Sequence, residues 1–241
     1  MGNFFKKVKA KLKGISRLLV RKRIEFTALE KEEYLNRFGI EKKDDKYEVT
    51  NADFLKKSYE KAWENRNYEI DKFWTRAAYF WGFIVLIFGG YISLLTSEHN
   101  QKAIEMRIDL YLVLLGFLFS LSWWLVILGS KCWQQNWEAH IDRLEDYVSG
   151  PIYKTIYYSG DRFYSVSKLN EIMAIVVFLV WCGLFGQYIY SHFSFTLNFR
   201  KMDLLATTAV LTTLLFACAL RFGYALGEYK TDKNNFIDRW E

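Results

Sequence analysis

The sequence has little proline, cysteine or histidine, and each shortage narrows what the chain can be. One proline, Pro151, in 241 residues leaves long helices uninterrupted. The three Cys and three His show no spacing typical of a zinc site or a disulfide framework. A serine–histidine–acid pattern and a glycine-rich phosphate loop are also missing. The sequence therefore predicts a protein that is not an enzyme, with no catalytic residues, metal or cofactor.

Apolar residues, by contrast, are abundant and fall in four blocks, at residues 77–95, 108–128, 172–190 and 204–220. Each block is close to the roughly 20 residues that cross a bilayer as a helix. After Asp109, at the mouth of the second block, none of them contains a charged side chain. The alternative is four buried helices of a soluble protein, but so short a chain has too little polar surface to cover them. We predict an all-α integral membrane protein with four transmembrane helices.

The distribution of Lys and Arg predicts the orientation of these helices. Residues 1–76 hold 20 of the 33 basic side chains, residues 129–171 hold five, and the tail after Leu220 holds four. The two remaining connectors hold only Lys102 and Arg107, and Arg200 and Lys201. Basic loops stay in the cytoplasm. Both termini are therefore predicted to be cytoplasmic, in a bacterial inner membrane.

The chain is predicted to have five segments, with helices 1 and 2 extending into a cytoplasmic helical domain. Asn51 or Asp53 caps the first long helix, and Ser149-Gly150-Pro151 ends the second. The segments are a basic amphipathic cytoplasmic region (1–50), a cytoplasmic helix continuing into the first span (51–96), the second span continuing into a cytoplasmic helix (108–148), a cytoplasmic loop (149–171), and the last two spans with the tail (172–241).

The first 23 residues combine basic charge with an apolar stripe. Nine Lys or Arg accompany Phe4, Phe5, Val8, Leu12, Ile15 and Leu19, with no acid before Glu25. This pattern predicts an amphipathic helix on an anionic membrane surface. A nucleic-acid-binding arm is the alternative, but a phosphate backbone has no use for the apolar stripe. The predicted lipid-binding residues are Lys6, Lys7, Lys9, Lys11, Lys13 and Arg17.

Aromatic stripes on the two cytoplasmic helices predict burial against each other or against a neighbouring subunit. We expect a homo-oligomer held partly by these faces. The packing residues are Trp63, Trp133, Trp137, Ile141 and Leu144. At the inner end of the fourth span, Ala219, Gly223 and Gly227 form a small-residue track suited to close helix packing.

Two sets of polar side chains have alternative interpretations. Glu138, Asp142 and Glu145 share one helix face, which suits a divalent ion or, as the simpler interpretation, a solvated surface. Without a second ligand set, we predict no metal there. Thr208 and Thr212 lie in the fourth block and suit a polar pore or hydrogen bonds between helices.

One region resembles a family of small bacterial membrane proteins of unassigned activity, connected to the RipA-like octameric membrane proteins. The resemblance covers roughly residues 63–155 and is carried by Gly129-Ser130-Lys131, Trp133-Gln134-x-Asn136-Trp137-Glu138-x-His140, Asp142-x-Leu144-Glu145-Asp146 and Gly150-Pro151-x-Tyr153-Lys154-Thr155. The group is similar to membrane accessory proteins of RNA-targeting CRISPR systems. The resemblance implies membrane location, self-assembly and a role in phage defence or stress.

From these patterns we expect a self-assembling membrane effector or channel-like protein. The alternative is a non-conducting scaffold that docks a cytoplasmic protein partner through its Trp-rich helices. Anionic lipid is the other expected partner, and nucleic acid is not expected.

Overall fold

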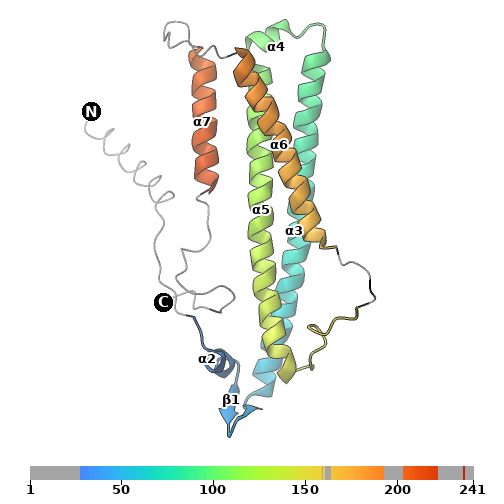
Figure 1. Cartoon of the computed structure of the whole chain (residues 1–241), viewed down its shortest axis with the longest axis vertical. Coiled ribbons are helices and arrows are strands. Elements are labelled where there is room, and N and C mark those ends of the chain that lie inside the picture. The colour runs from blue at the N-terminus through green and yellow to red at the C-terminus, as the bar shows by residue number, and fades with distance from the viewer. Residues whose placement is uncertain (1–27, 159, 161–163, 193–202, 222–235, 237–241) are drawn as a thin grey trace, which may run out of the picture. The chain divides into compact units, whose positions relative to one another are not determined.

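The computed structural model describes residues 28–158, 160, 164–192, 203–221 and 236, which form two compact units. We call residues 71–132 and 162–221 the membrane unit, and residues 1–70, 133–161 and 222–241 the polar unit. The elements are α2 (Lys31–Asn36), β1 (Ile40–Lys43), β2 (Lys46–Val49), α3 (Ala52–Thr96), α4 (Gln101–Glu105), α5 (Ile108–Leu144), α6 (Val166–His192) and α7 (Leu204–Arg221) (Figure 1).

Three helices of the membrane unit are long and apolar enough to cross a bilayer, namely α3, α5 and α6. Helix α7 has a shorter apolar stretch, Leu204–Leu220. Its 18 residues span about 27 Å at 1.5 Å per residue, slightly less than a typical hydrocarbon core. The mostly helical, multi-pass membrane fold is confirmed. A fourth span and the direction in which the helices cross stay predictions.

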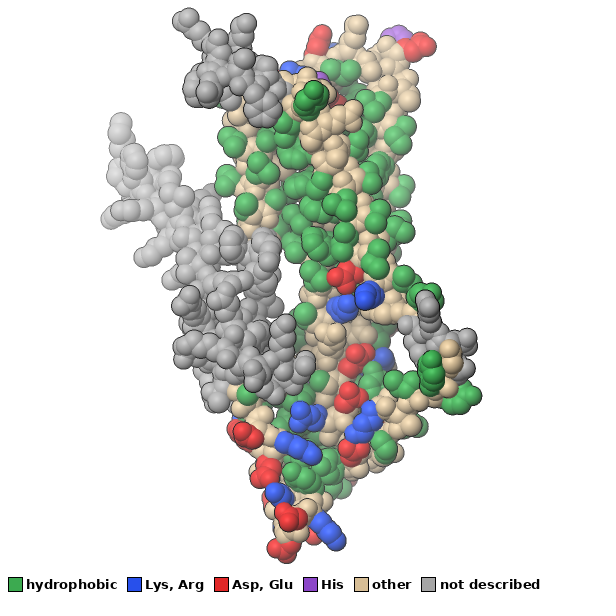
Figure 2. Space-filling view, viewed as in Figure 1, with side chains coloured by type: hydrophobic (Ala, Val, Ile, Leu, Met, Phe, Trp, Pro, Cys, Tyr) green, Lys and Arg blue, Asp and Glu red, His purple; other side chains and the backbone are tan. Residues whose placement is uncertain are grey.

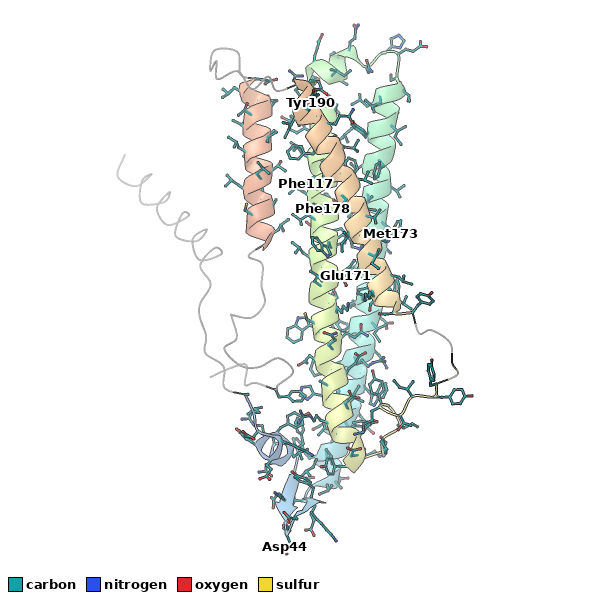
Figure 3. All side chains as sticks on the ribbon, in the orientation of Figure 1. Asp44, Phe117, Glu171, Met173, Phe178 and Tyr190 are labelled. Atoms are coloured by element: carbon teal, nitrogen blue, oxygen red, sulfur yellow. The ribbon has the colours of Figure 1, made fainter. Side chains whose placement is uncertain are left out.

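Aromatic side chains fill the core of the membrane unit. Trp181 of α6 is fully buried, and its ring lies 4.4 Å from that of Phe88 on α3. Phe117 and Phe178 point toward one another from α5 and α6, with ring centroids 5.4 Å apart (Figure 3). These contacts explain why three helices with weak amphipathicity still pack in a defined register, since large rings fit only where a neighbour leaves room.

Polar contacts join helices at both ends of the membrane unit. Near one end, Arg76 of α3 donates to Ser130 of α5 over 2.8 Å, and Lys131 pairs with Glu171 of α6 at 3.1 Å. Near the other end, Arg107 pairs with Asp203 at 2.8 Å. Charged side chains thus sit where the apolar stretches end, as expected at membrane boundaries.

The polar unit contains a β-hairpin that the all-α interpretation of residues 1–50 did not include. Strands β1 and β2 pair antiparallel, with Lys43 opposite Lys46. The two turn residues, Asp44 and Asp45, both have positive φ, at 43° and 64°. This is the conformation of a tight two-residue hairpin turn, and Asp tolerates it better than most residues. Apolar and charged residues alternate here over too few positions to predict a strand from the sequence.

Local signals set the ends of the long helices in the polar unit. The Asn51 side chain accepts a hydrogen bond from the Phe54 N–H over 3.1 Å, so Asn51 rather than Asp53 caps α3. Helix α5 ends at Leu144 and continues as a 3-10 turn through Tyr147. Gly150 then has a φ of +75° directly before the proline. The regular α-helix thus ends before the predicted stop at Ser149-Gly150-Pro151, and the 3-10 turn leads the chain into it.

The core of the polar unit lies between α2, the hairpin, α3 and α5. Its buried residues are Tyr34, Leu35, Ile40, Leu55, Tyr59, Ala62, Ile141 and Leu144. Figure 2 shows that charged side chains gather on this unit, while hydrophobic side chains dominate the visible face of the membrane unit. The polar unit therefore has a small apolar core inside a charged surface.

Candidate functional site: the aromatic junction of the polar unit

The rings around His140 form the most concentrated cluster of chemically distinctive side chains in the polar unit. We call Tyr34, Phe38, Trp137, His140 and Phe236 the aromatic junction. The Tyr34 hydroxyl and His140 Nδ1 are 2.8 Å apart. The centroid of the His140 ring lies 5.7 Å from Trp137, 6.0 Å from Phe38 and 4.7 Å from Phe236. The junction brings together α2 and the residues just after it, α5, and Phe236.

Burial fixes the protonation states of the central pair. It lowers the pKa of His140 to about 4, so the imidazole is neutral at pH 7. Burial also raises the pKa of Tyr34, an effect that Arg143 opposes, and the phenol stays protonated. The Tyr34 hydroxyl and Nδ1 then share one hydrogen bond between two uncharged groups, and the tautomer of the imidazole decides which of them donates. The pair is a structural hydrogen bond between α2 and α5.

We expect acid to destabilise this junction. The His140 pKa is about 4 in the folded chain and 6.5 unfolded. The contribution of the neutral His140 imidazole to folding stability is therefore fully present above pH 6.5. It is lost as the pH falls toward 4, and the total loss is about 3 kcal/mol. The measurement is thermal unfolding of the protein in detergent between pH 7.5 and 4.5, with hydrogen exchange at residues 31–36 as the local readout.

A matched variant isolates this contribution. His140→Asn keeps a side-chain amide that can accept from the Tyr34 hydroxyl or donate to it, but cannot take up a proton. It should remove most of the pH dependence of exchange at α2 while lowering stability at pH 7.5. The same acid response in the wild type and in His140→Asn would show that His140 does not titrate as its burial requires.

The three carboxylates of the predicted acidic face do not converge on one point. Glu138 pairs with Arg66 at 3.4 Å and accepts a hydrogen bond from Gln134 over 3.0 Å. Asp142 is exposed. Glu145 is fully buried and faces the following loop. In the part of the chain that the structure describes, no group of three or more His, Cys, Asp or Glu is placed to hold a metal ion.

Arg66 connects α3, α5 and the loop after α5. Its guanidinium lies 5.4 Å from the Trp63 ring centroid and 5.3 Å from that of Tyr153. The Trp63 and Tyr153 rings meet edge to face at 5.2 Å. A cation shared by two rings and the Glu138 carboxylate stabilises this corner of the unit. It also explains the acid at position 138 without invoking a metal.

Four of the five predicted packing residues lie in or against the core of the polar unit. Ile141 and Leu144 are buried, and Trp63 and Trp137 pack against the same cluster while remaining partly exposed. Trp133 is also partly exposed. The expectation that the two stripes pack against each other fits these positions for Trp63 and Trp137. Contact of these residues with a second subunit stays a prediction.

The predicted membrane-site residues are only partly within the described chain. Thr208 and Thr212 are exposed on α7, and each hydroxyl donates to a carbonyl of its own helix, at 3.0 Å and 2.8 Å. Ala219 is exposed as well. Gly223 and Gly227 lie outside the described residues. So do the predicted lipid-binding residues Lys6, Lys7, Lys9, Lys11, Lys13 and Arg17.

The sequence analysis did not identify three members of the junction, Tyr34, Phe38 and Phe236. All three lie far from α5 in sequence, in stretches that are mostly polar and show no apolar periodicity. The aromatic residues within these polar stretches were the available signal. Pairing them with His140 requires the tertiary fold.

The fold defines a class: a multi-pass helical membrane protein that also contains a polar unit with an apolar core of its own. Residues 56–190 match the model of the octameric membrane protein family, and the chain belongs to that family. No curated protein and no solved structure matches the chain. The match extends the resemblance seen at residues 63–155 through α6.

Proposed function

We propose that the protein is a self-assembling inner-membrane effector whose subunits enclose a channel-like path. Membership of the octameric family supports assembly from several copies of one chain. Closed rings are the usual outcome when identical subunits associate through one repeated contact. Beyond assembly, which the family implies, we propose a conducting path and an effector role.

The path is proposed to lie between subunits. Inside the described membrane unit, Trp123 and Trp181 are fully buried and Phe185 nearly so. These large rings occupy the space between α3, α5 and α6 and pack at van der Waals density. An aqueous route through one subunit would need polar side chains in their place.

The observation that carries the channel proposal is the exposed threonine pair of α7. Thr208 and Thr212 lie one turn apart on the same face, beside apolar residues such as Leu205 and Leu215. Their hydroxyls are bonded to the helix backbone but retain acceptor capacity for water. Repeated around a ring, this face would present rows of hydroxyls to a central path.

Ion flux in liposomes tests the proposal. The wild-type protein should release a trapped ion gradient, and the double variant Thr208→Val, Thr212→Val should reduce the rate about tenfold or more, because an apolar constriction of the same width dewets. Thr213→Val is the control, since Thr213 is buried on the other side of α7. It should leave flux unchanged. Flux that is absent from the wild type, or unaffected by the double variant, would exclude the α7 path.

We also propose an orientation of the protein in the membrane and a biological role. We place the polar unit and both termini in the cytoplasm, on the basis of the charge distribution. The basic first 23 residues would then contact anionic lipid of the inner leaflet. A role in phage defence or stress rests on the family resemblance alone.

A non-conducting scaffold is the second candidate, and one feature favours it. The loop after α5 exposes Ile152, Ile156 and Tyr157 by 73%, 74% and 86%. Apolar side chains this exposed in water are typical of a surface that receives a protein partner. A protein that assembles fully in the membrane yet passes no ions would support the scaffold, with this loop rather than the Trp-bearing helices as its docking surface.

A further inference from the structure

A buried carboxylate without a hydrogen-bond partner lies at the start of α5. Asp109, in the first turn of this helix, is only 8% exposed. Its Oδ1 atom is shielded from solvent and accepts no hydrogen bond. Removing an ionised carboxylate from water without a compensating partner is costly, so such a group takes up a proton or a cation.

A second buried oxygen belongs to α6. Tyr188 is 6% exposed, and its hydroxyl is likewise shielded from solvent and has no hydrogen-bond partner. The charge of Asp109 acts on this hydroxyl and on that of Tyr91, which comes from α3. Tyr91 packs against the same apolar core that contains Tyr188 and Leu110, the neighbour of Asp109. Three helices therefore bring oxygen atoms into the electrostatic range of one another at this end of the membrane unit.

The basic side chain at this end is already neutralised by another acid. The Nε and Nη2 atoms of Arg107 donate to one oxygen of Asp203 over 2.9 Å and 2.8 Å. The other Asp203 oxygen accepts from the Ala206 N–H over 3.1 Å and caps α7. Arg107 also acts on the Tyr188 hydroxyl. Two carboxylates and one guanidinium leave one negative charge unbalanced, and it belongs to the buried Asp109.

The position of Asp109 favours a metal cation over a proton. The N-terminal end of a helix carries a partial positive charge, which stabilises a carboxylate anion in its first turn. Carboxylate and hydroxyl oxygens are ligands that hard cations prefer. Divalent ions in proteins need more oxygen ligands or several carboxylates. One carboxylate with two phenol oxygens balances a single positive charge, which suits Na⁺ or K⁺.

We propose that Asp109, Tyr188 and Tyr91 form a binding site for a monovalent alkali-metal cation. The Asp109 carboxylate supplies the negative charge, and the two hydroxyls supply neutral oxygen ligands. The bound cation would connect α5 to α6 and α3 near the turn between α4 and α5, and would stabilise the three helices together. The site uses other helices than the threonine pair of α7, so the proposal stands whether or not the protein conducts ions.

Thermal unfolding of the full-length protein in detergent tests the site. At constant ionic strength, replacing N-methyl-D-glucamine chloride by NaCl or KCl should raise the unfolding midpoint by about 3 °C or more. Asp109→Asn removes the charge with little change in shape, so its midpoint should be the same in all three salts. In N-methyl-D-glucamine chloride this variant should be more stable than the wild type, because no unbalanced charge is buried. A carboxylate with a purely structural role would instead make the variant less stable in every salt.

Conservative variants separate the proposed ligands from their surroundings. Tyr188→Phe keeps the ring and removes one ligand, so the cation concentration needed for half of the midpoint shift should rise about tenfold. Tyr111→Phe removes a hydroxyl from an exposed residue of α5, and Glu105→Gln removes an exposed acid of α4. Both controls should respond to Na⁺ and K⁺ as the wild type does.

Retention of radioactive Na⁺ by the folded protein measures binding without unfolding. The wild type should retain the ion, and unlabelled Na⁺ or K⁺ should displace it. If Asp109→Asn does not fold, weaker retention by Tyr188→Phe than by Tyr111→Phe carries the test. A wild-type midpoint that is equal in the three salts, together with no retained Na⁺, would overturn the site. Equal cation responses of the wild type and Asp109→Asn would overturn it as well.

Discussion

Adding one methyl group at Gly116 should disrupt the membrane unit. A Cβ atom at this position of α5 would lie 2.3 Å from Cδ2 and from Cε2 of the Trp181 ring. Trp181 is fully buried and is itself in contact with Phe88, so its ring has no space into which to move. We expect Gly116→Ala to cost about 3 kcal/mol or more, at the upper end for overpacking, and Gly116→Leu to prevent folding. The measurement is the thermal midpoint and the elution profile in mild detergent.

Two controls connect this effect to the Trp181 contact. Gly183 of α6 has no atom within 4 Å of the position where a Cβ would be added. Gly183→Ala should therefore be neutral or stabilise the helix by up to about 1 kcal/mol. The double variant Gly116→Ala, Trp181→Leu should recover part of the lost stability, since the smaller side chain makes room for the methyl group. A Gly116→Ala protein as stable as the wild type would show that α5 and α6 do not meet at this glycine.

The sequence predicted the membrane unit well because its signals are local and strong. Long apolar stretches can be recognised without knowing what they touch, and all four predicted blocks lie on helices of the structure. The contact between Gly116 and Trp181 could not be predicted in the same way. Nothing in the sequence distinguishes Gly116 from Gly183, since both interrupt an apolar helix. Only the position of the facing ring separates them.

In the polar unit, prediction succeeded at helix ends and failed at tertiary contacts. Asn51 and Gly150 determine backbone geometry within a few residues, so their roles could be inferred from sequence. The spacing of Glu138, Asp142 and Glu145 predicts one acidic face. In the structure Glu138 pairs with Arg66, Glu145 accepts from loop backbone, and Asp142 is exposed. Residues on one helix face point in the same direction, but the groups that surround each side chain determine what it binds.

The largest effect in the polar unit is expected at Glu145. Its side chain is fully buried, and its carboxylate accepts hydrogen bonds from the N–H groups of Tyr153 and Lys154 over 2.7 Å and 3.1 Å. The ammonium of Lys154 is 4.0 Å away. The Glu145 backbone carbonyl also accepts from Val148, Ser149 and Gly150. One residue therefore closes the turn that contains the only proline of the chain.

Replacing this carboxylate should release the loop after α5. Glu145→Ala removes two charge-assisted hydrogen bonds and leaves their N–H donors without a partner, at a cost of about 2–4 kcal/mol. Glu145→Gln is expected to cost nearly as much, because its NH₂ group would face one of the two backbone donors. Hydrogen exchange at residues 149–155 measures the release directly, and the amides of Tyr153 and Lys154 should lose protection in both variants.

The neighbouring acid provides the matched comparison. Asp146 pairs with Lys154 at 2.6 Å, but both side chains are well exposed, at 49% and 38%. Exposed ion pairs contribute less than about 1 kcal/mol, so Asp146→Ala should leave exchange at Tyr153 almost unchanged. Comparing the two variants separates the buried Glu145 carboxylate, which accepts from backbone N–H groups, from the exposed Asp146 charge close to it. If Asp146→Ala and Glu145→Ala released the loop equally, electrostatic attraction of Lys154 rather than the hydrogen bonds of Glu145 would hold the turn.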